Sequence, residues 1–226
     1  HAYRLELHTP FSLHKQLHHG YSFMTKFYSL TVGLLSVNCY LAWSEDSSEA
    51  YIIDPGSEAA GIASAIAVRK LIPRGILLTH GHVDHIGAVP ELAQQFDIPV
   101  WIHPADRGLY ASPDNAINPW IPAVKGLPPS ADAPPAAAGI EMKVIHTPGH
   151  TPGGVCYYFP TGGVLLSGDT LFRGTIGRTD FPGGDYDTLI SSIKNNLLTL
   201  PPETKVCAGH EQSTTIARER DNPLFR

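Results

Sequence analysis

The feature that most constrains the fold of this chain is the segment THGHVDH at residues 79–85, which directly follows the apolar run GILL. His80 and His82 are two residues apart, so on an extended backbone their side chains point to the same side and can grip one metal ion. Asp84 and His85 follow where the chain must turn into a helix, and this bend can aim them at a second metal. The alternative, a polar surface loop, would need this cluster to arise by chance. The segment therefore predicts a buried strand that ends in a metal-binding loop.

Three further candidate ligands each follow an apolar segment. His150 lies in TPGHTPGG, where proline and glycine force a tight turn that presents the imidazole rigidly. Asp169 ends the segment GVLLSGDT, and His210 lies in VCAGHEQSTT just after a short apolar run. Strand ends converge at one edge of an α/β sheet, where sites normally form. Together with the first segment, these residues suffice for two metal ions.

The pattern along the chain predicts strands that alternate with helices, in two similar layered halves. The predicted strands cover residues 26–32, 36–43, 50–54, 75–79, 99–102, 141–146, 154–159, 163–168 and 204–208, and the predicted helices cover 58–70, 88–96 and 185–198. The segment 112–139 contains seven prolines and two glycines, which predicts a long loop that acts as a lid or binding element. Trp120 in this loop is a candidate wall of a substrate pocket, whereas Trp101 is predicted to be core.

Composition limits the class of protein. The chain has 226 residues, of which 42% are hydrophobic, enough for one domain with a sizeable core. The formal charge is −5 and no basic stripe is present, so nucleic acid is not an expected partner. Three widely spaced cysteines without a CxxC pair indicate a reducing compartment, and we expect a cytoplasmic protein. No apolar run approaches the roughly 20 residues that span a bilayer, so no membrane association is expected.

The N-terminal 23 residues differ from the rest of the chain. They contain five of the twelve histidines and show no clear periodicity. Met24 begins the first strand-like sequence, so we predict that residues 1–23 are an extension outside the domain and that residues 24–226 form it.

The five segments taken in order resemble the metallo-β-lactamase superfamily. Asp54 in IIDPG precedes THGHVDH, and His150, Asp169 and His210 follow. The resemblance implies a four-layer αβ/βα sandwich with the metal site at one edge, and support of the motif loop by Asp54. It also implies a first metal held by His80, His82 and His150, a second held by Asp84, His85 and His210, and Asp169 as a bridge between them.

Within that superfamily, the details resemble the glyoxalase II group and not the antibiotic hydrolases. SGDTLF, IGRTDFPGGDYDTL and the closing GHEQSTTIARERDNPLF are similar to short, single-domain bacterial members. Glu211 and Gln212 stand where these members usually have Gly-Pro, which alters the loop beside His210. No counterpart of the glutathione-binding helical domain follows, so glutathione is weakly supported as part of the substrate.

The resemblance implies a metal-dependent hydrolase of small-molecule thioesters or esters with two divalent ions, zinc first, with iron or manganese as alternatives. Water between two cations becomes hydroxide near neutral pH and attacks the carbonyl, with Asp84 and Asp169 as the catalytic carboxylates. A thiolate leaves without a strong general acid. Four cationic side chains are candidates for binding an anionic substrate: Arg107, Lys125, Arg173 and Arg178. Of these, Arg178 is expected to form an ion pair with Asp180 instead.

Two alternatives remain. A persulfide dioxygenase of the same fold would use one iron, held by the equivalents of His80, His150 and Asp169, although AGHEQSTT resembles the hydrolases. A metal-binding module without turnover would predict a degraded ligand set. His103 and His146, outside the motifs, are predicted to be structural. The sequence indicates no particular oligomeric state.

Overall fold

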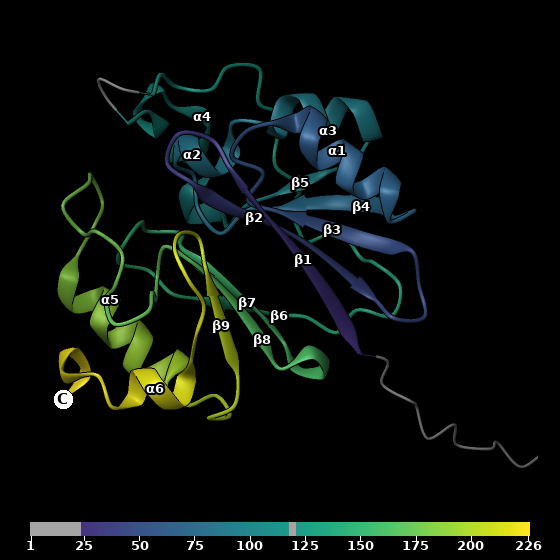
Figure 1. Cartoon of the computed structure of the whole chain (residues 1–226). Coiled ribbons are helices and arrows are strands. Elements are labelled where there is room, and N and C mark those ends of the chain that lie inside the picture. The colour runs from purple at the N-terminus through teal and green to yellow at the C-terminus, as the bar shows by residue number, and fades with distance from the viewer. Residues whose placement is uncertain (1–23, 118–120) are drawn as a thin grey trace, which may run out of the picture.

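The computed structural model describes residues 24–117 and 121–226, and it consists of two sheets packed face to face with helices on both outer sides (Figure 1). The predicted extension 1–23 and the candidate pocket residue Trp120 lie outside the described residues. The division of the chain at Met24 therefore stays a prediction.

The first sheet has the strand order β1-β2-β3-β4-β5. Its first three strands pair antiparallel through short turns, and β3, β4 and β5 pair parallel through the crossover helices α1 and α3. The bounds are β1 Thr25–Val32, β2 Val37–Ser44, β3 Glu49–Ile53, β4 Ile72–Leu77, β5 Val100–Trp101, α1 Ala59–Val68 and α3 Val89–Phe96.

The second sheet repeats this plan with the order β10-β9-β8-β7-β6. The strands β6, β7 and β8 pair antiparallel, and β8 pairs parallel with β9 after a helical crossover. The bounds are β6 Lys143–His146, β7 Val155–Phe159, β8 Val164–Gly168, β9 Lys205–Ala208, β10 Thr214–Thr215, α5 Tyr186–Ser192, continued by a π-helical turn Ile193–Leu197, and α6 Ile216–Arg220. The prediction of two similar halves is therefore confirmed.

Three apolar clusters hold the four layers together. One lies between the first sheet and helices α1 and α3, with Ile62 and Leu92 fully buried. A second fills the space between the sheets and contains Tyr157 and Trp101, which confirms Trp101 as core. The third lies between the second sheet and helix α5, around Leu189. Because both sheets are covered on both faces, β2, β7 and β8 are nearly continuous buried runs.

The proline-rich segment covers the edge of the first sheet. The backbone N–H of Ala131 donates to the carbonyl of Val100 in β5, and the Tyr51 hydroxyl donates to the carbonyl of Pro135. An exposed edge strand invites unwanted pairing, and this cover removes the free edge of β5. Ile117 and Ile121, further upstream, form a short antiparallel bridge near the site.

Several boundaries differ from the sequence prediction. Strand β4 begins at Ile72 and ends at Leu77, so His80 and His82 lie in a loop and not on an extended strand. Three short helices, α2 (Val83–Ile86), α4 (Arg107–Ala111) and α6 (Ile216–Arg220), were not predicted, because four or five residues are too few to show an amphipathic pattern.

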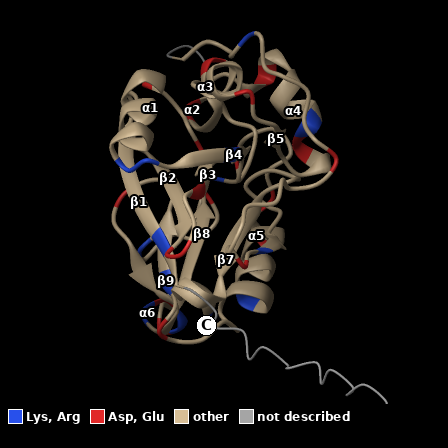
Figure 2. Ribbon diagram, turned by 90° about the vertical axis from the view of Figure 1, so that its right-hand side faces the viewer, with Lys and Arg blue, Asp and Glu red and all other residues tan. Residues whose placement is uncertain are grey.

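Residues of both charge signs are distributed over both halves of the molecule (Figure 2). No helix among the described residues is both long and apolar enough to cross a bilayer. The three cysteines are buried and form no disulfide.

Candidate metal centre

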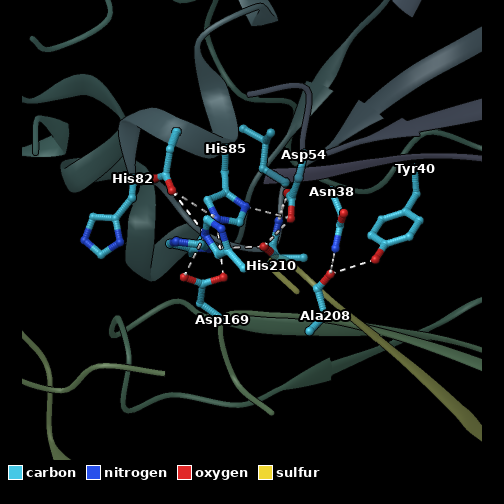
Figure 3. A network of polar contacts seen from close by, with 12 residues as sticks. Asn38, Tyr40, Asp54, His82, His85, Asp169, Ala208 and His210 are labelled. Atoms are coloured by element: carbon cyan, nitrogen blue, oxygen red, sulfur yellow. Dashed lines mark hydrogen bonds and ion pairs between the residues drawn. The ribbon is translucent and has the colours of Figure 1, made fainter. Parts of the chain in front are cut away.

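The seven predicted ligands meet at one edge of the sandwich, between the two sheets. Figure 3 labels four of them, His82, His85, Asp169 and His210. The loop after β4 and helix α2 contribute four of them, and the loops after β6, β8 and β9 contribute one each. Their ligand atoms form three overlapping groups: His80, His82 and His150; His80, His85 and Asp169; and Asp84, His85 and His210.

The first group is a cluster of three buried imidazoles. His82 Nδ1 and His150 Nε2 lie 3.0 Å apart, and the ring of His80 lies 4.9 Å from the His82 ring and 4.7 Å from the His150 ring. This is the set that the resemblance assigns to the first metal. The loop therefore brings His80 and His82 together without the extended strand from which their proximity was inferred.

The second group combines helix α2 with the loop after β9. His210 Nε2 lies 3.2 Å from Asp84 Oδ2, and His85 Nε2 lies 3.7 Å from the same oxygen. Asp169 lies between the groups, with one oxygen 3.4 Å from His85 Nε2 and the other 3.6 Å from His210 Nε2 and 3.8 Å from His150 Nε2. Asp169 is the residue that the resemblance assigns as a bridge between two metals.

Asp54, at the end of β3, fixes the ligands of the first half. Its carboxylate accepts hydrogen bonds from the Thr79 backbone N–H at 2.8 Å, the Thr79 hydroxyl at 2.6 Å and His85 Nδ1 at 3.1 Å. The Thr79 hydroxyl in turn accepts a hydrogen bond from His80 Nδ1 at 3.1 Å. One buried carboxylate thus orients two imidazoles and leaves the Nε2 atom of each facing the cluster.

Backbone carbonyls fix the ligands of the second half. His150 Nδ1 donates to the carbonyl of Arg178 at 2.6 Å, and His210 Nδ1 donates to the carbonyl of Leu35 at 2.9 Å. In both His150 and His210, Nδ1 therefore makes the hydrogen bond that fixes the ring, and Nε2 faces the cluster.

The donor set fits divalent metal ions. His80 Nε2, His85 Nε2 and Asp169 Oδ1 are buried and make no hydrogen bond within the described part of the chain. Burial and the neighbouring imidazoles keep the pKa of His80 well below its ordinary value, and burial and His150 lower the pKa of His82 to about 4. Both imidazoles are therefore neutral at pH 7 and offer a free lone pair. Buried polar atoms without partners are costly unless something binds them.

The carboxylates remain ionised in this cluster. Burial raises the pKa of Asp169 and Asp84, but His85 and the other imidazoles outweigh it and hold both below the ordinary value. Burial opposes the charge on His85, yet Asp84, Asp169 and Asp54 together raise its pKa well above the ordinary value. The carboxylates of the cluster thus favour a positive charge at its centre, where His85 lies.

Asp106, which sequence reasoning missed, connects the two ligand loops. This fully buried carboxylate accepts hydrogen bonds from the Gly81 N–H at 3.1 Å, the Thr151 hydroxyl at 2.8 Å and the Gly153 N–H at 2.6 Å. Gly81 separates His80 from His82, and Thr151 follows His150. A Cβ at Gly153 would lie 2.7 Å from Asp106 Oδ1, so glycine is required there.

A cavity of about 450 Å³, here named the central cavity, opens onto the cluster. It is lined by Leu35, His82, Asp84, Ile117, His150, Asp169, Phe172, Thr175, Ile176, Arg178, Phe181, His210 and Glu211. Of the four cations proposed to bind an anionic substrate, Arg178 is the one in this lining. Arg107 and Lys125 line a different cavity, and Arg173 donates to the side chain of Gln212.

The two histidines predicted to be structural lie outside the cluster. His103 and His146 stack on each other with ring centroids 4.1 Å apart and an interplanar angle of 14°. His103 Nδ1 accepts from the Ala105 N–H, and His146 Nε2 donates to the carbonyl of Pro152. Both therefore stabilise the loops behind the ligands.

The fold and the ligand cluster define a metal-dependent enzyme class. A sequence profile of the metallo-β-lactamase superfamily matches residues 32–210, and the chain belongs to this superfamily.

Relatives within the family carry hydrolase names. The chain is 41% identical over 196 residues to the hydroxyacylglutathione hydrolase GloC of Haemophilus influenzae, covering 83% of this chain and 92% of the relative. It is 38% identical over 211 residues to the probable metallo-hydrolase YqgX of Bacillus subtilis, covering 88% and 97%. These relatives support a metallo-hydrolase.

Solved structures of similar fold include a β-lactamase and a di-iron-bound protein. BLEG-1, a B3 metallo-β-lactamase, superposes with a TM-score of 0.81 at 38% identity over 88% of this chain and 99% of its own. A di-iron-bound form of TTHA1623 gives 0.77 at 40% identity over 88% and 100%. ETHE1 from Myxococcus xanthus gives 0.68 at 26% identity over 87% and 82%. The neighbours thus do not fix the metal or the substrate.

Proposed function

We propose that the protein is a dinuclear metal-dependent hydrolase of the glyoxalase II-like type, which cleaves a thioester or ester. The observation that carries this proposal is the second ligand group, in which Asp84, His85 and His210 converge beside Asp169. If the site held a single metal at the first group, Asp84, His85 and His210 would have no metal to bind. The similarity to GloC supports the thioester as substrate class.

His80, His82 and His150 would hold one metal, Asp84, His85 and His210 the other, and Asp169 would bridge them. Bound there, two divalent ions lower the pKa of a shared water and polarise the carbonyl of the substrate. Zinc is the first choice, and the di-iron-bound TTHA1623 keeps iron as an alternative.

The chain's own residues orient and shield the reaction. Asp54 and the carbonyls of Arg178 and Leu35 fix four of the imidazoles before substrate binds, which avoids reorganisation during the reaction. Asp84, beside His210, would orient the attacking water. Leu35 and Ile117 line the cavity that opens onto the cluster. A thiol of ordinary pKa near 8.5 leaves as the thiolate without a dedicated acid.

The principal alternative is a mononuclear iron persulfide dioxygenase with His80, His150 and Asp169 as ligands. It predicts one iron per chain and oxygen uptake, and it gives His210 no catalytic part. The position of His210 Nε2, 3.2 Å from Asp84 and 3.6 Å from Asp169, favours the dinuclear hydrolase.

The proposal is tested on one preparation of the protein. Hydrolysis is measured with S-lactoylglutathione, a neutral thioester and a cephalosporin, and oxygen uptake with glutathione persulfide is measured with an oxygen electrode. The expected result is thioester hydrolysis that a His210→Ala variant loses, without oxygen uptake. Cephalosporin hydrolysis at comparable kcat/KM would assign the chain to β-lactam chemistry, as the likeness to BLEG-1 allows. Oxygen uptake that survives in His210→Ala would replace the proposal by the dioxygenase.

A further inference from the structure

The walls of the central cavity away from the metal-facing residues are largely apolar. Its apolar side chains come from three separate segments: Leu35 from the β1–β2 turn, Ile117 from the proline-rich segment, and Phe172, Ile176 and Phe181 from the chain between β8 and α5. Phe181 also packs against His82, with ring centroids 4.9 Å apart. A ligand beside the cluster is therefore surrounded by hydrocarbon and aromatic surface.

The one Lys or Arg side chain in the lining is already paired with a carboxylate. Arg178 Nε lies 2.9 Å from Asp180 Oδ1 and a terminal nitrogen lies 2.8 Å from Oδ2, a bidentate ion pair. The guanidinium carbon also lies 4.3 Å from the centre of the Phe181 ring. This arrangement uses the fork of donors that would otherwise bind a carboxylate of the substrate.

The remaining charged side chain in the lining, apart from the metal-facing residues, is a carboxylate. Glu211 directly follows His210 in a left-handed backbone conformation with φ of 63°, and its carbonyl accepts a hydrogen bond from Asn38 Nδ2 at 3.1 Å. In the part of the chain that the structure describes, its carboxylate has no ion pair or hydrogen bond. The nearby Arg173 is held by Gln212 at 2.6 Å and is not part of the lining.

Resting on the proposed hydrolase function, we propose that the central cavity selects thioesters with an uncharged thiol portion and disfavours thiol carriers that bear carboxylates, such as glutathione. Away from the metal centre, an incoming carboxylate meets Glu211 and no unpaired Lys or Arg side chain, whereas an uncharged chain buries apolar surface against Leu35, Phe172 and Ile176. In the reaction, the water oxygen bonds to the acyl carbon and the C–S bond breaks. One carboxylic acid and one thiol are formed.

The test compares two substrates that share the acyl group and the scissile bond. S-lactoylglutathione carries two carboxylates and one ammonium group, whereas S-lactoyl-N-acetylcysteamine is uncharged. With metal-loaded protein at low salt, kcat/KM for the uncharged thioester is expected to exceed that for the glutathione thioester at least about fivefold, the effect of one unfavourable charge contact in water. The difference between the two substrates is expected to arise from KM and not from kcat. It is expected to become smaller at high salt, which screens charge repulsion.

Glu211→Gln and Glu211→Lys test the residue responsible. The ratio of kcat/KM for the glutathione thioester to that for the uncharged thioester is expected to rise about fivefold in Glu211→Gln and further in Glu211→Lys. Glu203→Lys is the matched control, because Glu203 is exposed before β9, at the opposite end of that strand, and changes the net charge equally. Its ratio is expected to equal that of the unmodified protein.

The outcomes separate the selectivity from the function. Preferred hydrolysis of the glutathione thioester, with a ratio that Glu211→Lys does not change, would overturn the selectivity and leave the hydrolase intact. Hydrolysis of neither thioester by metal-loaded protein would overturn the proposed function, and the selectivity with it.

Discussion

The two halves of the molecule hold their ligands by different means. In the first half, four ligands come from six consecutive residues, and the side-chain carboxylate of Asp54 orients His85 directly and His80 through Thr79. In the second half, the three ligands are separated along the chain, and His150 and His210 are oriented by backbone carbonyls. The first half therefore depends on one side chain, whereas the second depends on the shape of its loops.

Metal removal affects both halves and gives the largest expected effect. Without metal, His80 Nε2 is buried without a hydrogen bond in the described structure, at a cost of about 1–3 kcal/mol. His85 Nε2 and Asp169 Oδ1 make no hydrogen bond there and lie 3.4 Å from each other. A chelator is expected to abolish hydrolysis and to lower the melting temperature, and Zn²⁺ is expected to restore both. Retained activity in metal-free protein, verified by elemental analysis, would contradict the metal centre.

Asp54→Ala is expected to weaken metal binding about 10- to 100-fold, because Asp54 orients His85 directly and His80 through Thr79. The matched variant in the second half is Arg178→Ala, which keeps the carbonyl that anchors His150. Titration of both apoproteins with a competing zinc chelator measures the effect. Equal losses in the two variants would remove the difference between the halves.

Asp106→Asn tests the connection between the halves. An amide places a donor against one of the N–H groups of Gly81 and Gly153, so the free energy of unfolding is expected to fall by about 1–3 kcal/mol. The visible absorption spectrum of the cobalt-substituted variant is expected to change as well, since His82 and His150 lose their alignment. Lower stability with an unaltered spectrum would limit Asp106 to a structural role.

The smallest expected effect concerns Cys156, in the sheet of the second half. Burial raises its pKa from the ordinary value of 9.0 to about 11, despite hydrogen bonds from Thr147 and Thr170 that lower it. The unfolded thiol ionises first, so the stability it contributes is complete below pH 9 and is lost as the pH rises to about 11. Urea unfolding is expected to show this decline and Cys156→Ala to reduce it. An identical pH dependence in both would rule out this thiol.

The difference between the two halves also explains which features could be predicted from the sequence. THGHVDH concentrates its candidate ligands, and the repeated order of strands and helix marks both halves, so the fold could be predicted from the sequence, and so could the seven side chains that converge at one edge of it. Asp106 could not, because its partners lie 25, 45 and 47 residues away. The carbonyl anchors have no sequence signal, since any residue supplies one. Arg107 and Lys125 could be identified as cations, but the cavity they line depends on the fold.

The most direct test of the account is the metal content per chain of protein purified without added metal. The dinuclear centre predicts close to two metal ions per chain, and close to one in His210→Ala, because the second ligand group then loses a member. A single iron per chain, unchanged in His210→Ala, would contradict the dinuclear centre and with it the proposed hydrolase.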